Sequence, residues 1–492
     1  TLNVKAKDGV TLKKVRNFEK FNFQLSDDTT KTAPLLNLTE AGGFGKVTAD
    51  NSDVTVKWAN VAADLSKVTT EKDAAKIQGR NTYTLMRAAD NSLKFSDYAA
   101  RYAVHGGVYE TGMRTDTNAA TAKEVLYDVN RFKDGRVTYT AASTGEALGG
   151  YSAFGNTTEG NELTLAGATG TLAAVYGGQT AGAMGNSVNN KVTLKDTGAG
   201  SIANVYGGAI TKAANGGNAT GNTVTLTGGT VTGAVYGGYT EGSGKTTGNT
   251  VNIGADPTTL RQGDASTLAA GTNFAAAELY GGNKADAAGN TLNVTVKDAA
   301  AKKAQNFDKY TFYLTNSVAA DKSSSGTVDD TFTKSRGTML TLAEGFDGQT
   351  ADWSKVTVDT SKLSADKTLG AITLMKSTAA NKLKFSNYAA KNHAVSGDYE
   401  VVQRTDTNTS EANAVLIDVN RFRNGDVTYH NGDNNAKTYA GVSYGGNTVE
   451  GNTFTLKGIS EGKTLKYVSG GRSEGTAGGA VNNTVNLVNT GA

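Results

Sequence analysis

Two sets of arginine and aspartate residues, 290 residues apart, are the strongest candidates for chemistry in this chain. The first set is Arg114, Asp116, Asp128 and Arg131, and the second is Arg404, Asp406, Asp418 and Arg421. Two carboxyl groups about 5 to 9 Å apart can cleave a glycosidic bond as an acid and base pair. Arginine beside aspartate can hold a sugar acid through paired hydrogen bonds. Glu110 and Glu400 coincide at the same offset, so one polar constellation occurs twice as a candidate ligand site.

The local pattern around these residues also favours a structural role. The segments D-V-N-R-F-K-D-G-R-V-T-Y (128–139) and D-V-N-R-F-R-N-G-D-V-T-Y (418–429) each predict a strand, a D-G or N-G turn and a second strand. Asp and Asn would satisfy backbone groups of the turn, and the arginine would lie over an aromatic ring such as Phe132 or Phe422. Three roles stay open for these residues. The sequence favours a structural turn and ion pair first, contact with a glycan second and catalysis third, and no catalytic residue is assigned.

Other residue types that commonly carry catalysis are scarce. The three histidines, His105, His393 and His430, do not coincide at the 290-residue offset, although a duplicated active site should repeat its base. The chain has no cysteine, which excludes disulfides, thiolate nucleophiles and thiolate metal sites. No EF-hand loop or G-G-x-G-x-D array occurs. We therefore predict that the chain is not an enzyme and has no cofactor or metal site.

Charge and hydropathy exclude further classes. Lys and Arg number 49 against 46 Asp and Glu, the formal net charge is +3, and no basic run of five occurs, so the footprint of nucleic-acid binding is missing. No apolar stretch of 18 residues is present, and we predict no transmembrane segment. Any signal peptide is expected to have been removed or to lie outside this chain.

The elements that would position the candidates come from a duplicated array. T-L-N-V-K-A-K-D (1–8) returns as T-L-N-V-T-V-K-D (291–298), and L-K-F-S-D-Y-A-A (93–100) returns as L-K-F-S-N-Y-A-A (383–390). L-S-K-V-T (65–69) is matched with W-S-K-V-T (353–357), an offset of 288, so small insertions are expected between the copies. A long period of this kind is typical of repeat architectures.

A shorter repeat lies between the two long copies. Y-G-G motifs follow one another around Tyr176, Tyr206, Tyr236 and Tyr280, the first three 30 residues apart, and they alternate with strands such as N-T-V-T-L (222–226). Strict alternation would point Val224 and Leu226 to one side and Thr223 and Thr225 to the other. The repeated tyrosines are expected to stack as a ladder, either outward or inward.

These short strands and glycine turns predict an all-β chain, most readily an elongated right-handed parallel β-helix, or β-solenoid. No single unit of about thirty residues can bury its own apolar face, whereas stacked units share a continuous core of valine, leucine and isoleucine. We divide the chain into 1–144 and 292–440, two copies of a less regular β segment, and 145–291 and 441–492, two Y-G-G segments of which the second stops in mid-repeat. The array is expected to continue beyond both ends of this sequence.

The pattern V-Y-G-G followed by G-N-T-V-T-L resembles the glycine-rich repeats in passenger regions of autotransporter-type surface proteins of Gram-negative bacteria, many of them adhesins. The resemblance is clearest over 145–297 and returns over 441–492. It implies a parallel β-helix, an extracellular location at the bacterial cell surface or outer membrane, and roles in attachment or matrix. No segment for translocation is visible.

The sequence thus predicts a secreted, fibre-like β-solenoid that acts as a structural stalk or adhesin through repeated surfaces. Its expected partners are host or bacterial surface glycans or proteins, bound through loops on the flank such as 48–53 and 319–326. Two alternatives stay open: a self-associating extracellular filament or matrix subunit, and a carbohydrate-active lyase or hydrolase on the same fold.

Overall fold

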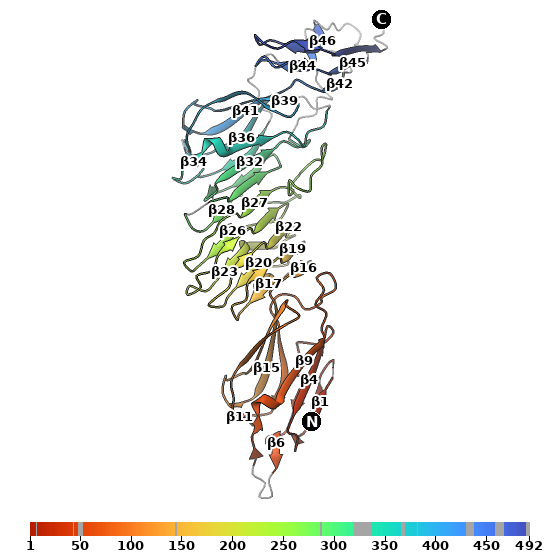
Figure 1. The fold of residues 1–492 in the computed structure, drawn as a ribbon, viewed down its shortest axis with the longest axis vertical. Helices are drawn as coiled ribbons and strands as arrows, with labels where there is room; N and C mark the ends of the chain where they lie inside the picture. Colours follow the sequence, from red (N-terminus) through yellow and green to blue (C-terminus); the bar gives the residue numbers. More distant parts are fainter. Residues whose placement is uncertain are drawn as a thin grey trace.

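The fold was analysed in a computed structural model, which describes residues 1–5, 7–42, 44–47, 53–142, 145–285, 288–318, 337–365, 370–380, 382–429, 437–457 and 467–488. The molecule is elongated and all-β, with β1 in the lower part and β46 near the top of the view in Figure 1. The described residues contain no α-helix, only two 3-10 turns, η1 (Trp58–Asn60) and η2 (Trp353–Lys355). The expected loop segments 48–53 and 319–326 lie, except for Asp53, outside the described residues.

The middle of the molecule is a stack of parallel strands, here called the central stack. Its largest sheet has eight strands in the order β16 (Arg136–Tyr139), β19 (Glu162–Leu165), β22 (Lys191–Leu194), β25 (Thr223–Leu226), β27 (Thr250–Ile253), β29 (Thr291–Val294), β32 (Lys309–Tyr313) and β35 (Val356–Asp359). A six-stranded sheet contains β17 (Gly145–Ser152), β20 (Thr171–Thr180), β23 (Ser201–Ile210), β26 (Ala234–Thr240), β28 (Glu278–Gly282) and β31 (Lys303–Gln305). A third sheet contains β18 (Thr158–Glu159), β21 (Ser187–Val188) and β24 (Ala219–Thr220). All three sheets are parallel.

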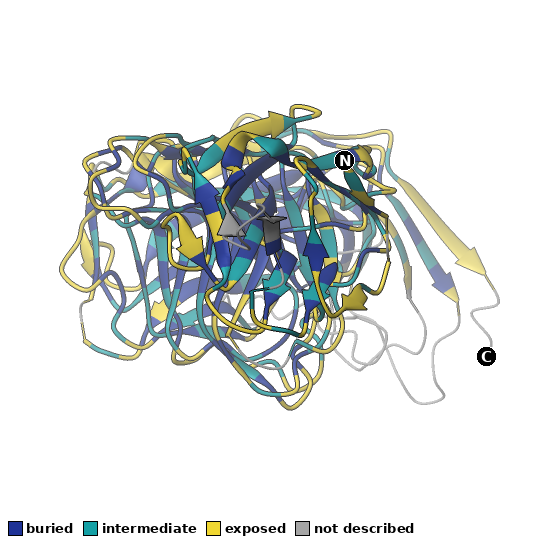
Figure 2. Ribbon diagram, turned by 90° about the horizontal axis from the view of Figure 1, so that it is seen from below, coloured by how far each residue is buried: buried dark blue, intermediate teal, exposed yellow. Residues whose placement is uncertain are grey.

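The apolar positions of the repeat form the core of this stack. Val224 pairs with Val192 on one side and Val251 on the other, so equivalent residues lie directly above one another. Val224 and Leu226 are fully buried in one core that the whole central stack shares, which confirms their expected inward direction. Seen down the long axis, the buried residues line the strands and most exposed residues lie in the peripheral turns (Figure 2).

Each less regular segment ends in a mixed sheet that contains an antiparallel hairpin. The first such sheet has the order β12 (Arg101–His105), β13 (Tyr109–Thr115), β15 (Glu124–Arg131), β10 (Thr82–Ala88), β5 (Leu36–Leu38) and β2 (Val10–Leu12). The second has the order β38 (Lys391–Ser396), β39 (Tyr399–Thr405), β41 (Ala414–Arg421), β36 (Ala371–Ser377), β33 (Thr338–Leu342) and β30 (Ala299–Ala301). Pairing is parallel from β2 to β10 and from β30 to β36, and antiparallel beyond. Parallel pairing of strands is therefore interrupted twice along the chain, after β10 and after β36.

Small sheets complete the two copies. The first copy contains β1 (Leu2–Val4), β4 (Phe21–Ser26) and β9 (Val61–Lys67), then β3 (Val15–Arg16), β6 (Phe44–Val47) and β7 (Asp53–Val54), and then β8 (Val56–Lys57), β11 (Leu93–Ser96) and β14 (Thr121–Ala122). The second copy contains β34 (Ala351–Asp352), β37 (Leu383–Ser386) and β40 (Glu411–Ala412). A second parallel stack begins after β41 with β42 (Asp426–Tyr429), β45 (Thr453–Lys457), β48 (Thr484–Val488), β43 (Lys437–Ser443), β46 (Tyr467–Ser473), β44 (Val449–Glu450) and β47 (Ala480–Val481).

One detail of the repeat differs from the expectation. Trp58 and Trp353 hold equivalent places, because each donates its indole N–H at 2.6 Å to a backbone carbonyl, that of Ala99 or Ala389. The copies are therefore displaced by 295 residues here, and the match of Leu65 with Trp353 is wrong. Sequence similarity over five residues was too short to locate the insertion.

Candidate functional site

The eight candidate arginines and aspartates lie in the two hairpin sheets, four in each. Arg114 lies on β13 and Arg404 on β39, whereas Asp128, Arg131, Asp418 and Arg421 lie on β15 and β41. Asp116 and Asp406 follow β13 and β39 directly. The duplication seen in the sequence is thus a duplication of position in the fold.

Arg114 and Asp128 form an ion pair. Arg114 Nε lies 2.9 Å from Asp128 Oδ2, and Nη2 lies 3.4 Å from Oδ1. Thr82 on the neighbouring strand donates its hydroxyl to Asp128 Oδ1 at 2.7 Å. The carboxylate is nearly buried, so these contacts stabilise its charge within the sheet.

The second copy has lost part of this arrangement. Ala371 lies opposite Asp418, in the place where Thr82 lies opposite Asp128, and therefore no hydroxyl is offered there. Burial raises the pKa of Asp418, while the charge of Arg404 acts in the opposite direction. The two copies therefore differ in how well this carboxylate is stabilised.

Asp116 and Asp406 close turns. Asp116 Oδ1 accepts hydrogen bonds from the backbone N–H of Lys123 at 3.2 Å and of Glu124 at 3.1 Å. Asp406 Oδ1 accepts two equivalent bonds at 3.1 Å, from the backbone N–H of Asn413, directly before β41, and of Ala414, its first residue. Both carboxylates accept hydrogen bonds from backbone N–H groups at the start of a strand, which is the structural role that the turn pattern favours for aspartate.

Arg131 is a fully buried guanidinium at the end of β15. It donates Nη1 to Tyr109 Oη at 3.0 Å, Nη2 to the carbonyls of Thr70 at 3.0 Å and Asp134 at 2.9 Å, and Nε to the carbonyl of Lys133 at 3.2 Å. Its carbon Cζ lies 5.2 Å from the centre of the Tyr109 ring. Every nitrogen is directed at a group of this chain, which makes Arg131 a packing residue.

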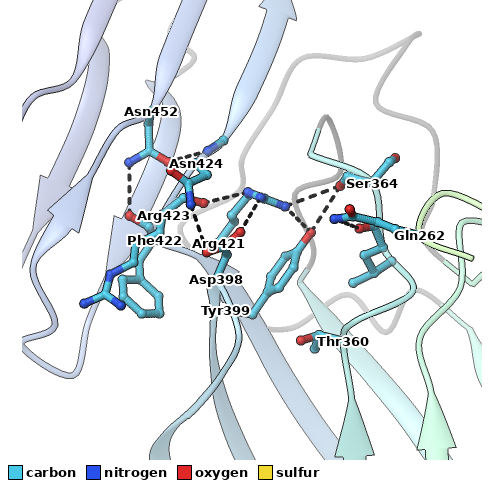
Figure 3. A network of polar contacts seen from close by, with 12 residues as sticks. Gln262, Thr360, Ser364, Asp398, Tyr399, Arg421, Phe422, Arg423, Asn424 and Asn452 are labelled. Carbon is cyan, nitrogen blue, oxygen red and sulfur yellow. Dashed lines mark hydrogen bonds and ion pairs between the residues drawn. The ribbon is translucent and has the colours of Figure 1, made fainter.

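Arg421 repeats this role, as Figure 3 shows. It donates Nη1 to Tyr399 Oη at 2.7 Å and Nε to the carbonyl of Arg423 at 2.8 Å. Nη2 pairs at 3.0 Å with Asp398, a carboxylate present only in this copy. The expected ring partners are wrong for both buried arginines, which lie over the tyrosines on β13 and β39. The Phe422 ring does have an arginine over it, since Arg423 Cζ lies 5.0 Å from its centre.

The most enclosed charged groups are Glu110 and Glu400, each without exposed surface. Glu110 accepts five hydrogen bonds, from Asn130 Nδ2 at 3.0 Å, Ser152 Oγ at 2.8 Å, Ala153 N at 2.6 Å, Phe154 N at 3.3 Å and Asn156 Nδ2 at 2.9 Å. Four of these donors lie at the end of β17 in the central stack, one on its last residue, Ser152, and three on the segment that follows it. Glu110 therefore ties the hairpin to the next run of parallel strands.

Glu400 does the same for the second copy. Its donors are Ser443 Oγ at 2.6 Å, Tyr444 N at 3.0 Å, Gly445 N at 3.1 Å, Asn447 Nδ2 at 2.7 Å and His393 Nδ1 at 3.0 Å. Burial acts to raise the pKa of Glu400, but these hydrogen bonds together lower it below its ordinary value. With its lone pairs saturated, this carboxylate is an anchor and has no free oxygen for acid or base chemistry.

An asparagine ladder runs through the parallel strands and was not predicted. Asn161, Asn190, Asn222, Asn249 and Asn290 are fully buried, and each of the first four donates its side-chain Nδ2 to Oδ1 of the next at 2.8 to 3.3 Å. The signal was present in the sequence, since an asparagine precedes every strand of the N-T-V-T-L type. Amide stacking of this kind satisfies buried turn groups from one strand to the next.

The tyrosine ladder is confirmed. Tyr176, Tyr206, Tyr236 and Tyr280 stack with ring centres 4.8 to 5.4 Å apart and planes within 12°. Val175 belongs to the shared core whereas Tyr176 belongs to a separate cluster, so the rings lie on the outer face of the six-stranded sheet. Tyr176 is buried and the other three rings are half-buried, and Tyr239 packs edge-on against Tyr206 and Tyr236.

The described residues contain no group of three or more His, Cys, Asp and Glu side chains placed to hold a metal ion. Within the same ranges no helix has the length and apolar character needed to cross a membrane. His393 contacts Glu400, whereas His430 lies outside the described residues.

Comparison of this chain with protein-family models, with curated proteins and with solved structures finds no match in any of the three.

Proposed function

We propose that this chain is part of an extracellular bacterial surface protein, a β-solenoid stalk or adhesin that works through its length and its repeated outer surfaces. The observation that carries the proposal is the parallel register of the central stack, in which eight strands pair residue for residue around one apolar core. Such a stack extends in one direction by adding units. The resemblance of its Y-G-G and G-N-T-V-T-L repeats to autotransporter passenger regions supports the location.

We propose a non-catalytic role for the duplicated polar residues. Asp116, Arg131 and Arg421 direct their polar atoms at backbone or side-chain groups of the chain itself. Glu110 and Glu400 accept four or more hydrogen bonds each. These contacts favour turn, ion pair and anchor over substrate binding, and they move the expected ligand contacts to the outer surfaces.

The location is tested on intact cells that carry the gene. Antibodies raised against the purified chain should label these cells without permeabilisation, and protease added from outside should remove the label. Labelling that appears only after lysis would overturn the surface location.

The adhesive role is tested by valency. Beads coated with many copies of the chain should attach to a surface of host cells or glycans far better than the single chain binds, because many weak contacts act together. If each chain bound equally well on beads and in solution, or if the coated beads bound no surface, the adhesive role would be rejected and the structural stalk role would remain. Degradation of a polysaccharide by the chain, abolished by Asp116→Asn, would instead favour the carbohydrate enzyme.

A further inference from the structure

The two hairpins have edge strands that differ in one respect. In the first copy β12 pairs with β13 in an unbroken ladder from Arg101 opposite Met113 to His105 opposite Tyr109. In the second copy the register of β38 against β39 shifts between Lys391 and Ala394. The same place in the fold therefore carries one regular edge and one interrupted edge.

The interruption in β38 is a β-bulge. Lys391 lies opposite Gln403 and Ala394 opposite Val401, so that two residues, Asn392 and His393, face the single position between them. His393 has a φ of 54°, in the left-handed region, and its ring contacts the buried Glu400. A bulge bends an edge and disturbs its hydrogen-bonding groups, which protects it against added strands.

No such protection exists on β12. It is the last strand of its sheet, and nothing in the described part of the chain pairs with its outer side. Tyr102 is 59% exposed and Val104 53%, and Ala103 between them is also exposed. An unbroken edge with exposed apolar side chains is a template for another strand.

We propose that β12 is an interaction edge that binds β12 of a second copy of this chain, antiparallel and about a two-fold axis at Ala103. In this register Tyr102 of each copy lies opposite Val104 of the other, an aromatic and β-branched pair that stabilises antiparallel sheets. The pair forms twice because the axis relates the two strands. The sequence of this edge is thus complementary to itself.

The charged end of the strand does not oppose this pairing. Arg101 lies opposite His105 of the second copy in this register, but its guanidinium is directed to its own chain. It donates to the carbonyl of Val61 and lies 5.4 Å from the centre of the Trp58 ring. The contact spans five residues per strand, so it belongs to the small interfaces that bind weakly one at a time and gain strength in arrays.

Single cysteines test the proposal, because the chain has none of its own. Residues directly opposite in an antiparallel pair have Cα atoms about 4.5 to 5.5 Å apart, within reach of a disulfide. Ala103→Cys should therefore give a disulfide-linked dimer on mild oxidation of the full chain. Ala394→Cys, at the equivalent position of the bulged edge, is the matched control and should give no disulfide-linked dimer.

A second pair of variants tests the same contact without an introduced cysteine. Val104→Lys places a charge opposite Tyr102 of the other copy and should reduce dimer formation roughly tenfold in sedimentation equilibrium. Val395→Lys, the equivalent change on β38, should leave it unchanged. Both positions are exposed, so the fold is expected to survive, and circular dichroism checks this.

The outcomes separate clearly. Dimer from Ala103→Cys alone, weakened by Val104→Lys, supports the paired edge. Equal cross-linking of Ala103→Cys and Ala394→Cys, a parent chain that stays monomeric at all concentrations, or a dimer that Val104→Lys does not weaken would each overturn it. These results concern contact between copies, and they stand whether or not the proposed surface location is correct.

Discussion

Glu110→Gln should loosen the first hairpin from the central stack. Glu110 Oε1 accepts from Asn130 and Ala153, and Oε2 accepts from Ser152, Phe154 and Asn156. Glutamine replaces one oxygen by an NH2 group. Whichever oxygen is replaced, one backbone N–H, that of Ala153 on Oε1 or that of Phe154 on Oε2, then faces another donor, because a serine hydroxyl or an asparagine amide can turn to accept and a backbone N–H cannot.

The magnitude follows from that lost bond. A hydrogen bond to a charged group contributes about 1.5 to 3 kcal/mol, and a buried donor left without a partner costs a similar amount. One such loss lowers the free energy of local opening by about 1.5 to 3 kcal/mol. Amide hydrogen exchange of Ala153 and Phe154 should therefore accelerate by a factor between about ten and a few hundred.

The duplication provides an internal control for this measurement. The amides of Tyr444 and Gly445 bond to Glu400, so their exchange should stay at the parent rate in Glu110→Gln. Glu400→Gln should give the reverse pattern, and Glu19→Gln at an exposed site should change neither. Unchanged protection at Ala153 in Glu110→Gln would refute the anchor role of this carboxylate.

Three further outcomes are expected. Val224→Asp should destabilise the central stack by about 3 kcal/mol or more, because a charge enters a buried ladder without a partner, whereas Thr223→Asp on the outer side should cost little; equal denaturation midpoints would contradict the inward assignment. The pKa of Glu400 is lowered in the folded chain, so its stabilisation is present above its ordinary pKa and is lost as pH falls through the folded-state value; Glu400→Gln should then cost less stability at acid pH than at neutral pH, and a constant cost would argue against the linkage. Burial first, and neighbouring charges second, raise the pKa of Tyr176 and of Tyr236 to about 12, so these phenols should ionise later than an ordinary phenol in an absorbance titration; Tyr236→Phe should reduce the amplitude of the late phase, and an unchanged late phase would contradict the shift.

The parallel strands could be predicted from the sequence because their signal is local and repeated. Val224 and Leu226 alternate with polar residues in a segment that returns several times, and one pattern sets both inward direction and register. The stacking of Tyr206 on its neighbours followed from the same period. The repeat-like strand structure is therefore confirmed, whereas the solenoid geometry stays a proposal.

The antiparallel hairpins could not be predicted in this way. The strand, turn and strand around Asp134 are present, and the turn residue has a φ of 51°, but β15 and β16 join different sheets and are not paired with each other. Whether a strand pairs with its neighbour in sequence depends on which partner strand buries more of its apolar surface. The answer depends on residues far away in the sequence, which a local pattern does not contain.

The candidate site was found in part. The repetition of Glu110 and Glu400 was visible, yet their donors lie some forty residues further on, beginning with Ser152 and Ser443 at an offset of 291. The bulge in β38 could not be seen in the sequence comparison, because the connection between the two strands of that hairpin is one residue shorter. Two residues separate β38 from Tyr399, whereas three separate β12 from Tyr109. One insertion and one deletion cancel and leave the 290-residue offset unchanged on either side.

The alternation of parallel stacks with antiparallel hairpins bears on how such a chain responds to tension and how it folds. In an uninterrupted stack every strand pairs with the next in the same sense, so damage at one level exposes the neighbouring level and can spread. Here parallel pairing ends at β10 or β36, an antiparallel hairpin follows, and a new parallel run begins at β16 or β42. Side-chain anchors join the runs across the gap. A pulled chain should therefore yield in separate steps, one parallel run or hairpin at a time, and a chain that is synthesised gradually from its N-terminus can complete one run before the next has appeared.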